Sequence, residues 1–454
     1  MAPRPGLVIR EKRLNAIGAW LGASSSILAE FASGDAAQRV RTFSEAAPDD
    51  VTAALNFLGG IEGAAIVVHA PRGCAAAALA QKGAAAFAVT GLDQRDTIIG
   101  SGEALARTIR SLVERHRPWV VFIVGGPVVA INSDDIRSVA ADLTETLGIP
   151  VLQVQTDGFR SRIAATGYDA ATKPLLPLAS APFAGAREDV INIIALNARA
   201  GDGIAMLLEP LGLRGNLLPG GANAASFELA GKALLTVPFD GDAGTTFAES
   251  LAEATGVPFL LLPPPIGLSA SRAWSEAVAA ATGRSAWPAT CHPVEADRAL
   301  DGLRVHIALP QAFAFAAAGL VEELGGAISA LTVDHLDKTH LPAARAFAER
   351  WPEATLHAAA GQPFELANLL SKTKPDLFIG PPPLAAFASR AGIAAVGAAP
   401  YQLIGASGAE WLASKARNAL ANRAFGARLA GIRSPYASGW YRRSADWHIK
   451  QEVR

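Results

Sequence analysis

The residue with the clearest potential for metal chemistry in this chain is a cysteine on a short turn. Cys74 follows an apolar run and stands directly after Pro71, Arg72 and Gly73. A glycine lets the backbone bend closely around a bulky inorganic cluster. A thiolate at the end of a strand, beside backbone N–H groups that stabilise its charge, can ligate such a cluster. The alternative is that Cys74 is a small buried hydrophobic residue, the common fate of a lone cysteine.

The second cysteine, Cys291, is a weaker candidate for metal binding. It lies in a proline-rich segment beside His292, and neighbouring residues rarely both reach one metal ion. We therefore expect an ordinary loop or core cysteine there. Two cysteines form no disulfide framework, and the sequence contains no CxxC pair or zinc-type Cys/His cluster. Most ligands of any metal cluster would have to come from another chain.

Two polar turns follow Cys74 in the sequence. The first contains Ser101 and Glu103, which we expect to cap a helix and to lie in its first turn, where the helix dipole favours a negative charge. The second contains the pair Asp134 and Asp135, which could bind a metal or exchange protons but better fits the start of a helix. The sequence has no GxxxxGK[ST] phosphate loop, so a separate partner would have to hydrolyse any ATP.

A later polar stretch combines imidazole and carboxylate groups. His335 and His340 flank Asp334 and Asp337. These groups could bind a metal weakly, but we expect a solvated helix or loop face. The sequence offers no Ser-His-Asp arrangement, GxSxG elbow, HExxH motif or pair of glutamates at helical spacing, so we assign no catalytic residue.

Short apolar runs alternate with amphipathic stretches along the whole chain. The runs lie at residues 64–68, 119–124, 151–154, 190–196, 233–237, 259–262, 305–309, 328–332, 377–379 and 394–396. Continuous apolar runs are typical of parallel strands that are buried on both faces. The alternation predicts a doubly wound, Rossmann-like α/β fold with parallel sheets. Functional side chains are then expected at the carboxyl ends of the strands.

The chain is too long for one ordinary core, and proline-rich breaks divide it. Its 454 residues predict three α/β domains at residues 1–185, 186–298 and 299–410, followed by a tail at residues 411–454. The tail begins as a helix and becomes aromatic and basic. Because a disordered tail would carry few aromatic residues, we expect it to anchor a subunit interface.

Composition and charge narrow the class of partner. Only 18% of the residues are charged and the net charge is −1, which gives no electrostatic reason to expect nucleic acid or an acidic membrane as a partner. No uninterrupted apolar run reaches the length of a membrane span. Together with the sparse cysteines, these observations predict a cytoplasmic protein.

The order of these features resembles the amino-terminal region of nitrogenase component 1 and its relatives. Those relatives include nitrogenase catalytic subunits, cofactor-assembly scaffold subunits and dark-operative chlorophyll-pathway reductases. In that family the first such strand ends in Gly-Pro-x-Gly-Cys or Gly-Ser-x-Gly-Cys. Pro71, Gly73 and Cys74 match this element, while Ala70 replaces its first glycine.

The resemblance implies that Cys74, with Pro71 and Gly73 around it, ligates an iron–sulfur cluster. Other cysteines of the family pattern are missing, since Pro127 stands where the family has the cysteine that precedes its paired aspartates. One ligand fits a 4Fe–4S cluster that is completed by a homologous three-cysteine, α-type subunit. The turn around Gly158 matches a strand-ending turn of the same family.

The resemblance also implies the partners. We expect a heterotetramer that receives electrons from a separate ATP-hydrolysing iron protein. The single cysteine favours a β-type (NifN-like) subunit that acts in cofactor assembly for nitrogen fixation or in electron transfer. One alternative is a subunit of a divergent nitrogenase-like reductase that acts on a tetrapyrrole or a small reducible substrate. Another is a cluster-free α/β protein that binds a small molecule.

Overall fold

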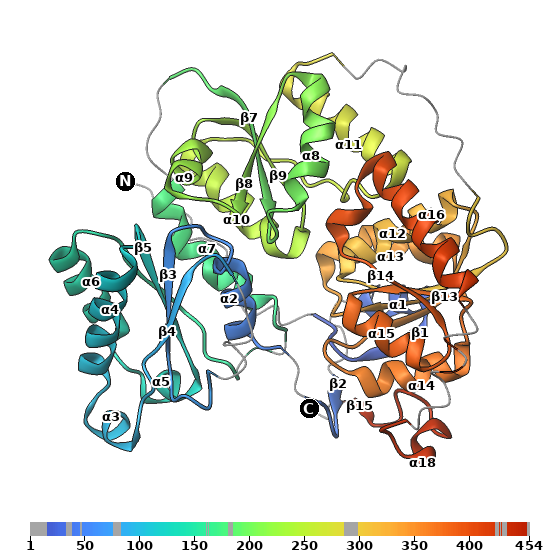
Figure 1. Ribbon diagram of the computed structural model, residues 1–454, viewed down its shortest axis with the longest axis horizontal. Helices are drawn as coiled ribbons and strands as arrows, with labels where there is room; N and C mark the ends of the chain where they lie inside the picture. The colour runs from blue at the N-terminus through green and yellow to red at the C-terminus, as the bar shows by residue number, and fades with distance from the viewer. Residues whose placement is uncertain are drawn as a thin grey trace. The chain divides into compact units, whose positions relative to one another are not determined.

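Alternating helices and strands build the chain, as the computed structural model shows (Figure 1). It describes residues 16–32, 39–45, 48–75, 83–159, 161, 163–179, 185–285, 298–422, 426, 428 and 434–451. The chain divides into two compact units. We call the unit built on Pro48–Leu262 the first unit, and the unit built on Asn15–Ala47 with Pro263–Arg454 the second unit.

The first sheet lies in the first unit and has the strand order β4-β3-β5-β6. Its strands all run parallel and are β3 (Ala64–His69), β4 (Ala86–Val89), β5 (Val120–Gly125) and β6 (Val151–Val154). Every residue of β3 and β5 is buried. These strands are therefore central, as their continuous apolar sequences predict.

Alternate residues of β3 and β5 enter two different cores, so helices cover both faces of this sheet. Val67 and Ile123 pack with α4 (Gly102–His116) and α6 (Ile136–Leu147). Their neighbours in sequence pack with α2 (Asp50–Leu58) and α7 (Thr166–Ala179). Side chains of a strand point to opposite faces in turn, and this arrangement is the doubly wound fold that the sequence predicts.

A second parallel sheet, in the order β8-β7-β9, belongs to the same unit. Its elements are β7 (Glu188–Ala195), β8 (Arg214–Pro219), β9 (Ala233–Pro238), α8 (Ala200–Leu208), η3 (Glu209–Leu211), α9 (Ala224–Ala230) and α10 (Gly241–Thr255). Ile194, Phe227 and Phe247 lie in one core cluster with residues of the first sheet. The two sheets therefore share a hydrophobic core.

The third sheet lies in the second unit and has the order β1-β12-β11-β10-β13-β14. Its strands are β1 (Trp20–Ala23), β10 (Arg304–Ala308), β11 (Ala327–Val333), β12 (Thr355–Ala358), β13 (Leu377–Gly380) and β14 (Ala394–Gly397). All its pairs are parallel except β1 with β12. An antiparallel edge strand is common on such sheets.

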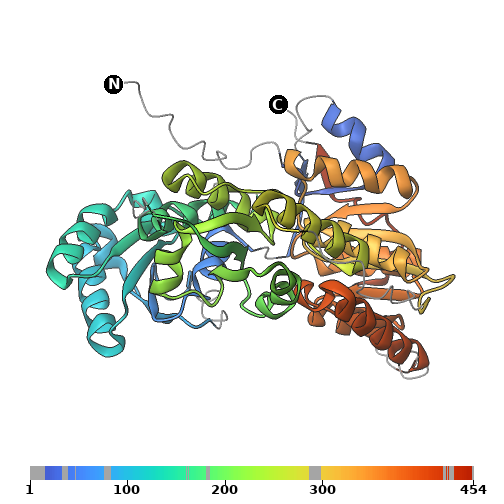
Figure 2. The same cartoon turned by 90° about the horizontal axis from the view of Figure 1, so that it is seen from above.

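Helices cover both faces of the third sheet, as Figure 2 shows within the second unit. They are α1 (Ser24–Ala32), α11 (Gly267–Thr282), α12 (Gln311–Glu323), α13 (Leu341–Arg350), α14 (Pro363–Thr373), α15 (Pro382–Arg390) and α16 (Gly405–Ala421), with the short turns η4 (Lys338–His340) and η5 (Pro400–Leu403). Across the described residues, no helix is long and apolar enough to cross a membrane.

The aromatic tail packs onto its own unit. Its strand β15 (Ile449–Gln451) pairs with β2 (Arg39–Arg41), and α18 (Ser438–Tyr441) precedes it. The indole Nε1 of Trp440 donates a hydrogen bond to the carbonyl of Phe364 on α14 at 2.8 Å, and His448 is buried. These aromatic residues anchor the tail within the second unit, and its expected role at a subunit interface stays a prediction.

The predicted α/β fold with parallel sheets is confirmed. The first and second sheets lie within the predicted domains at residues 1–185 and 186–298, whereas the third sheet combines strands of residues 299–410 with β1 from the N-terminal region. The boundaries at residues 185, 298 and 410 stay predictions. Cys291 and His292 lie outside the described residues.

Candidate functional site

The loops with the sequence-predicted site residues meet at one edge of the first sheet. All pairs in this sheet are parallel, so the carboxyl ends of its strands share that edge. The Cys74 turn follows β3, and α5 (Pro127–Asn132) follows β5. The turn at Gly158 follows β6. Ligand sites in doubly wound folds lie at this edge.

Cys74 sits on a turn just beyond β3 and is exposed. Its backbone N–H donates to the carbonyl of Pro71 at 3.1 Å, and the N–H of Ala75 donates to Arg72 at 3.2 Å. The N–H groups of Cys74 and Ala75 are therefore used within the turn, and the expected stabilisation of a thiolate by backbone N–H groups stays a prediction. Exposure of Cys74 also argues against the buried-hydrophobe alternative.

The neighbouring positions differ in how tightly the chain packs around them. A side chain at Gly73 would meet nothing within 4 Å, so this chain's own packing does not require a glycine there. By contrast, a Cβ at Gly126 would lie 2.8 Å from the Cβ of Ala70. Ala70 takes the place of the family's usual glycine, and Gly126 leaves room for its methyl group. The turn is thus fixed at its base, and space is open beside its tip.

A buried chain of hydrogen bonds lies beneath this edge. His69, the last residue of β3, is fully buried. Its Nδ1 lies 3.2 Å from Thr90 Oγ1 and its Nε2 lies 2.9 Å from Ser101 Oγ. The Ser101 hydroxyl donates to Asp134 in turn. The imidazole of His69 therefore joins the end of β3 to Thr90, and through Ser101 to Asp134.

The protonation pattern in this chain follows from burial and from the donors. Desolvation lowers the pKa of His69 to about 4, and the nearby carboxylate of Asp134 opposes the shift only in part. The imidazole is therefore neutral near pH 7. The Ser101 hydroxyl donates its hydrogen bond to Asp134, so it can only accept from His69. The proton of the neutral imidazole therefore lies on Nε2, and Nδ1 accepts a hydrogen bond from the Thr90 hydroxyl. Such a chain could hold or pass one proton at this edge.

The two expected helix starts are used differently from the prediction. Ser101 occupies the N-cap position of α4, but its side chain makes no cap hydrogen bond because it binds Asp134. Asp135 caps α6 by accepting from the backbone N–H of Ser138 at 3.1 Å. Of the paired aspartates, Asp135 therefore caps a helix, and Asp134 accepts the last hydrogen bond of the buried chain. The positions of Ser101 and Glu103 at the start of α4 are as expected, whereas of the two aspartates only Asp135 begins a helix, and it does so as the N-cap.

Asp50 is a site residue that the sequence did not single out. It lies at the start of α2 and accepts from the N–H groups of Asp157 at 3.0 Å and Gly158 at 2.8 Å. Burial raises the pKa of Asp50, although these two hydrogen bonds oppose the shift. Asp50 and Asp134 line one cavity of about 420 Å³ at the ends of β5 and β6. Asp50 is recognised as a site residue only from its contacts with Asp157 and Gly158, which lie far away in the sequence.

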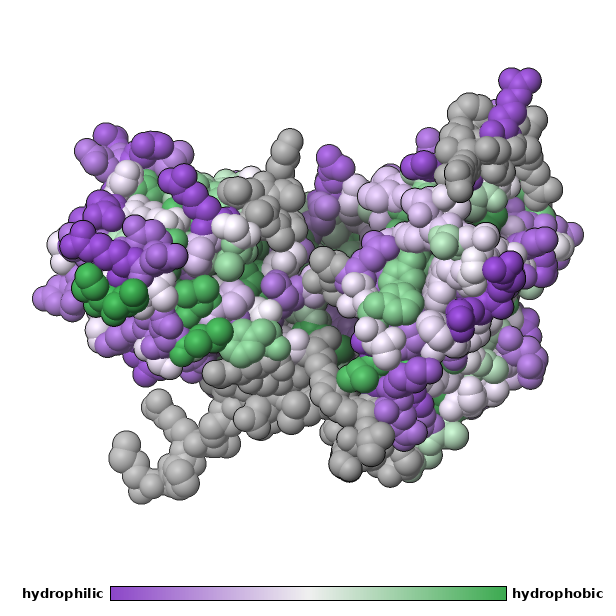
Figure 3. All heavy atoms as spheres, turned by 90° about the horizontal axis from the view of Figure 1, so that it is seen from below, coloured by the Kyte–Doolittle hydropathy of each residue, from purple (hydrophilic) through white to green (hydrophobic). Residues whose placement is uncertain are grey.

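Exposed apolar side chains gather on two short helices at this edge. Ile98 and Ile99 on α3 (Gln94–Ile99) are 84% and 73% exposed, and Ile131 on α5 is 69% exposed. The Asn132 amide donates to the carbonyl of Thr97 at 3.2 Å and ties the two helices together. Figure 3, viewed from below, shows apolar side chains gathered on this side of the first unit. A soluble surface rarely exposes such groups together without a partner.

The donor set fits one ligand for an iron–sulfur cluster. Cys74 is the free cysteine of the described residues, and its thiol is exposed. Gly73 and Pro71 shape the turn, but they carry no ligand atom in their side chains. A cluster held here would need its remaining ligands from another chain.

Comparisons with known proteins agree with this fold. Residues 51–421 match the family described as nitrogenase component 1 type oxidoreductase. The chain adopts the fold of a solved structure entitled "Nitrogenase Cp1 at pH 6.5", with a TM-score of 0.71, 17% identity, and coverage of 85% of this chain and 94% of that chain. The protein belongs to the nitrogenase component 1 family.

Curated relatives include proteins named nitrogenase iron-molybdenum cofactor biosynthesis protein NifE. The protein from Klebsiella pneumoniae is 32% identical over 102 residues, which are 20% of this chain and 22% of the relative. A relative from Methanococcus maripaludis is 26% identical over 211 residues, 42% of this chain and 43% of the relative. The matched part thus spans less than half of these relatives.

Proposed function

We propose that this protein is a subunit of a two-component, nitrogenase-like iron–sulfur complex in the cytoplasm. Cys74 supplies its one ligand to a 4Fe–4S cluster that is shared with a homologous three-cysteine subunit in a heterotetramer. A separate ATP-hydrolysing iron protein delivers the electrons. The cluster, when bound, supplies one-electron transfer.

The position and exposure of Cys74 carry this proposal. The thiol lies at the carboxyl edge of the first parallel sheet, on a turn that matches the family element at Pro71, Gly73 and Cys74. The open space beside Gly73 leaves room for a cluster at the tip of the turn. A single exposed thiol holds a cluster poorly by itself, which is why the proposal requires a partner.

The apolar surface on α3 and α5 supports protein partners at the same edge. Ile98, Ile99 and Ile131 are mostly exposed there, and apolar side chains that are exposed next to polar turns are common at protein interfaces. We propose that a protein of the complex covers them.

Cofactor assembly is the role that the relatives support best. The curated relatives described above are named for iron-molybdenum cofactor biosynthesis. We propose a scaffold role in such assembly, with the single cysteine favouring the β-type (NifN-like) subunit. No residue of this chain is assigned a catalytic role.

The test compares the chain alone with the chain in complex. Expressed anaerobically alone, it should be colourless and hold well under one iron per chain. Co-expressed with a three-cysteine subunit of the family, the pair should co-purify with about four iron atoms per two unlike subunits. Stoichiometric iron–sulfur absorbance in the isolated chain would contradict the shared cluster, unless the chain forms a homodimer with two Cys74 ligands. Co-purification without iron would contradict it as well.

A further inference from the structure

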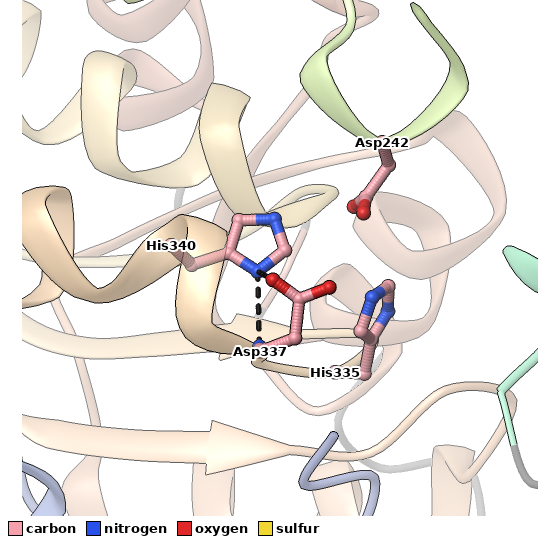
Figure 4. A group of neighbouring side chains, drawn as sticks. All are labelled: Asp242, His335, Asp337 and His340. Atoms are coloured by element: carbon pink, nitrogen blue, oxygen red, sulfur yellow. Dashed lines mark hydrogen bonds and ion pairs between the residues drawn. The ribbon is translucent and has the colours of Figure 1, made fainter. Parts of the chain in front are cut away.

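Three side chains of the second unit converge just after strand β11. His335 and Asp337 lie on the loop that follows this strand, and His340 ends the turn η4 (Figure 4). A short bridge holds the loop in place, because Ile17 and Leu336 exchange two backbone hydrogen bonds of 2.7 and 2.9 Å. Asp242, also drawn in Figure 4, belongs to the first unit and is no part of the proposed site.

The cluster is buried, which contradicts the solvated face that the sequence predicted. His335 is 3% exposed, Asp337 is 7% exposed and His340 is 6% exposed. Burying a carboxylate and two imidazoles is unfavourable unless their polar atoms are paired or hold a cation. The burial therefore separates this group from an ordinary polar surface loop.

The geometry suits a small divalent cation. The potential ligand atoms of the three residues all lie within 4.8 Å of one another. Asp337 Oδ1 lies 3.2 Å from His340 Nδ1. Two ligands at about 2.1 Å from a tetrahedral zinc ion would be roughly 3.4 Å apart, so these atoms need little movement to share one ion.

Neighbouring groups orient two of the three side chains, His335 and Asp337. Gln311 Oε1 accepts from the N–H of Asp334 at 3.2 Å, so the Gln311 amide nitrogen donates to His335 Nδ1 at 2.8 Å, and an ion bound at that nitrogen would replace this donor. Asp337 Oδ1 accepts from the N–H of Thr339 at 2.8 Å. An outer hydrogen bond of the kind made by Asp337 holds a coordinating carboxylate in place in known metal sites.

We propose that His335, Asp337 and His340 bind a divalent transition-metal ion, with zinc as the best fit. Two imidazoles and one carboxylate form a ligand set that zinc accepts, and three protein ligands leave one tetrahedral position for water or a substrate atom. The N–H of Asp337 donates to His340 Nδ1 at 3.1 Å, and a bound ion would replace that donor. The site lies in the second unit and is separate from the Cys74 turn.

The direct test is metal binding to the full chain after chelator treatment. Titration with Zn²⁺, followed by calorimetry, should show one tight equivalent per chain, and Co²⁺ should give the visible bands of a tetrahedral ion. Asp337→Asn is the sharpest variant because asparagine also caps a helix while it removes the charge. It should weaken binding by about 10-fold or more. The double variant His335→Ala/His340→Ala should abolish stoichiometric binding.

Controls separate this site from other ligands of the chain. His116→Ala removes an exposed imidazole and should leave the zinc equivalent intact. Cys74→Ala removes the thiol of the proposed cluster site and should also leave it intact, so this test does not depend on the proposed function. Binding that survives the double variant would overturn the proposal, as would a wild-type chain that binds no stoichiometric zinc. Circular dichroism checks that each variant is folded.

Discussion

Ser101 is the residue whose role the local sequence predicted least well. Its position before a helix indicates a cap, and it does occupy the N-cap of α4. Its hydroxyl instead joins His69 to Asp134, two residues from other segments. Local composition reveals a cap but cannot reveal a partner that the fold brings from another strand. Asp50 escaped notice for the same reason.

Replacing Ser101 tests the buried chain directly. In Ser101→Ala, the buried Nε2–H of His69 loses its acceptor, and we expect a loss of roughly 1–3 kcal/mol in the free energy of unfolding. Denaturant titration measures it. Ser138→Ala is the matched control, because it removes an exposed hydroxyl bonded to Asp135 at 2.7 Å and should cost clearly less. Equal losses in both variants would argue against the role of Ser101.

At the scale of helices and strands, continuous apolar runs predicted strands well. Strands that are short or rich in small residues were not predicted. The run at residues 151–154 coincides with β6 (Val151–Val154). By contrast, β1, β4, β8 and β12 contain small or polar residues that hide the apolar signal. The run at residues 259–262 forms no strand and makes only an isolated bridge between Phe259 and Thr236. Prolines follow it directly and remove the hydrogen-bond donors that a strand needs.

A buried carboxylate, which no local sequence pattern singles out, fixes the tail. Glu365 on α14 is fully buried and accepts from His448 at 2.7 Å, from His357 at 2.9 Å and from Arg41 Nε at 2.6 Å. Burial alone would raise the pKa of Glu365, but hydrogen bonds from His357 and Arg41 lower it to about 2. The carboxylate thus holds β2, β12 and the tail together.

The contact between His448 and Glu365 should matter for stability. His448→Ala removes a donor to a buried charge and the stacking with Phe43, whose ring centre lies 4.4 Å away. We expect a loss of about 2–4 kcal/mol in the free energy of unfolding. Trp447→Ala is the control, because Trp447 is 44% exposed and should cost much less. A His448→Ala variant as stable as the control would contradict the anchoring of the tail.

At the scale of the whole molecule, the α/β class and the parallel sheets were predictable because they rest on many alternating runs. The grouping of the first two sheets around one core was not predictable, because it depends on contacts between residues distant in sequence. One example is Phe247, which lies in the same core cluster as residues of the first sheet. The proposal that Cys74 is a cluster ligand came from a resemblance to a family, whereas the exposure of Cys74 came from the structure. The sequence pointed to the group of His335, Asp337 and His340 but not to its burial, because most of the residues in this stretch are polar.

Buried neutral histidines make the stability of the whole molecule depend on pH. Burial lowers the pKa of His69 to about 4 and that of His306 to about 3. In the unfolded chain each takes up a proton near pH 6.5, so their contribution is complete above that pH and is lost as the pH falls toward the folded values. Each histidine can lower the free energy of unfolding by at most about 1.4 kcal/mol for each pH unit. The raised pKa of Asp50 opposes this trend.

We therefore expect the midpoint of denaturant unfolding to fall steadily from about pH 6.5 to pH 4.5. Below about pH 4.5 the loss should steepen, because the unfolded chain then protonates its counterpart of Glu365. Urea titrations at a series of pH values measure this dependence. A midpoint that stays constant or rises over this range would show that the buried histidines are not held neutral.

The most direct measurement concerns Cys74 in the assembled complex. Cys74→Ala should lower the iron content of the co-purified complex or shift its electron-spin signal, while circular dichroism shows that the chain still folds. Cys291→Ser is the matched control and should leave iron content and signal near wild type. Unchanged iron and an unchanged signal in Cys74→Ala would contradict its assignment as the ligand that this chain contributes to the shared cluster.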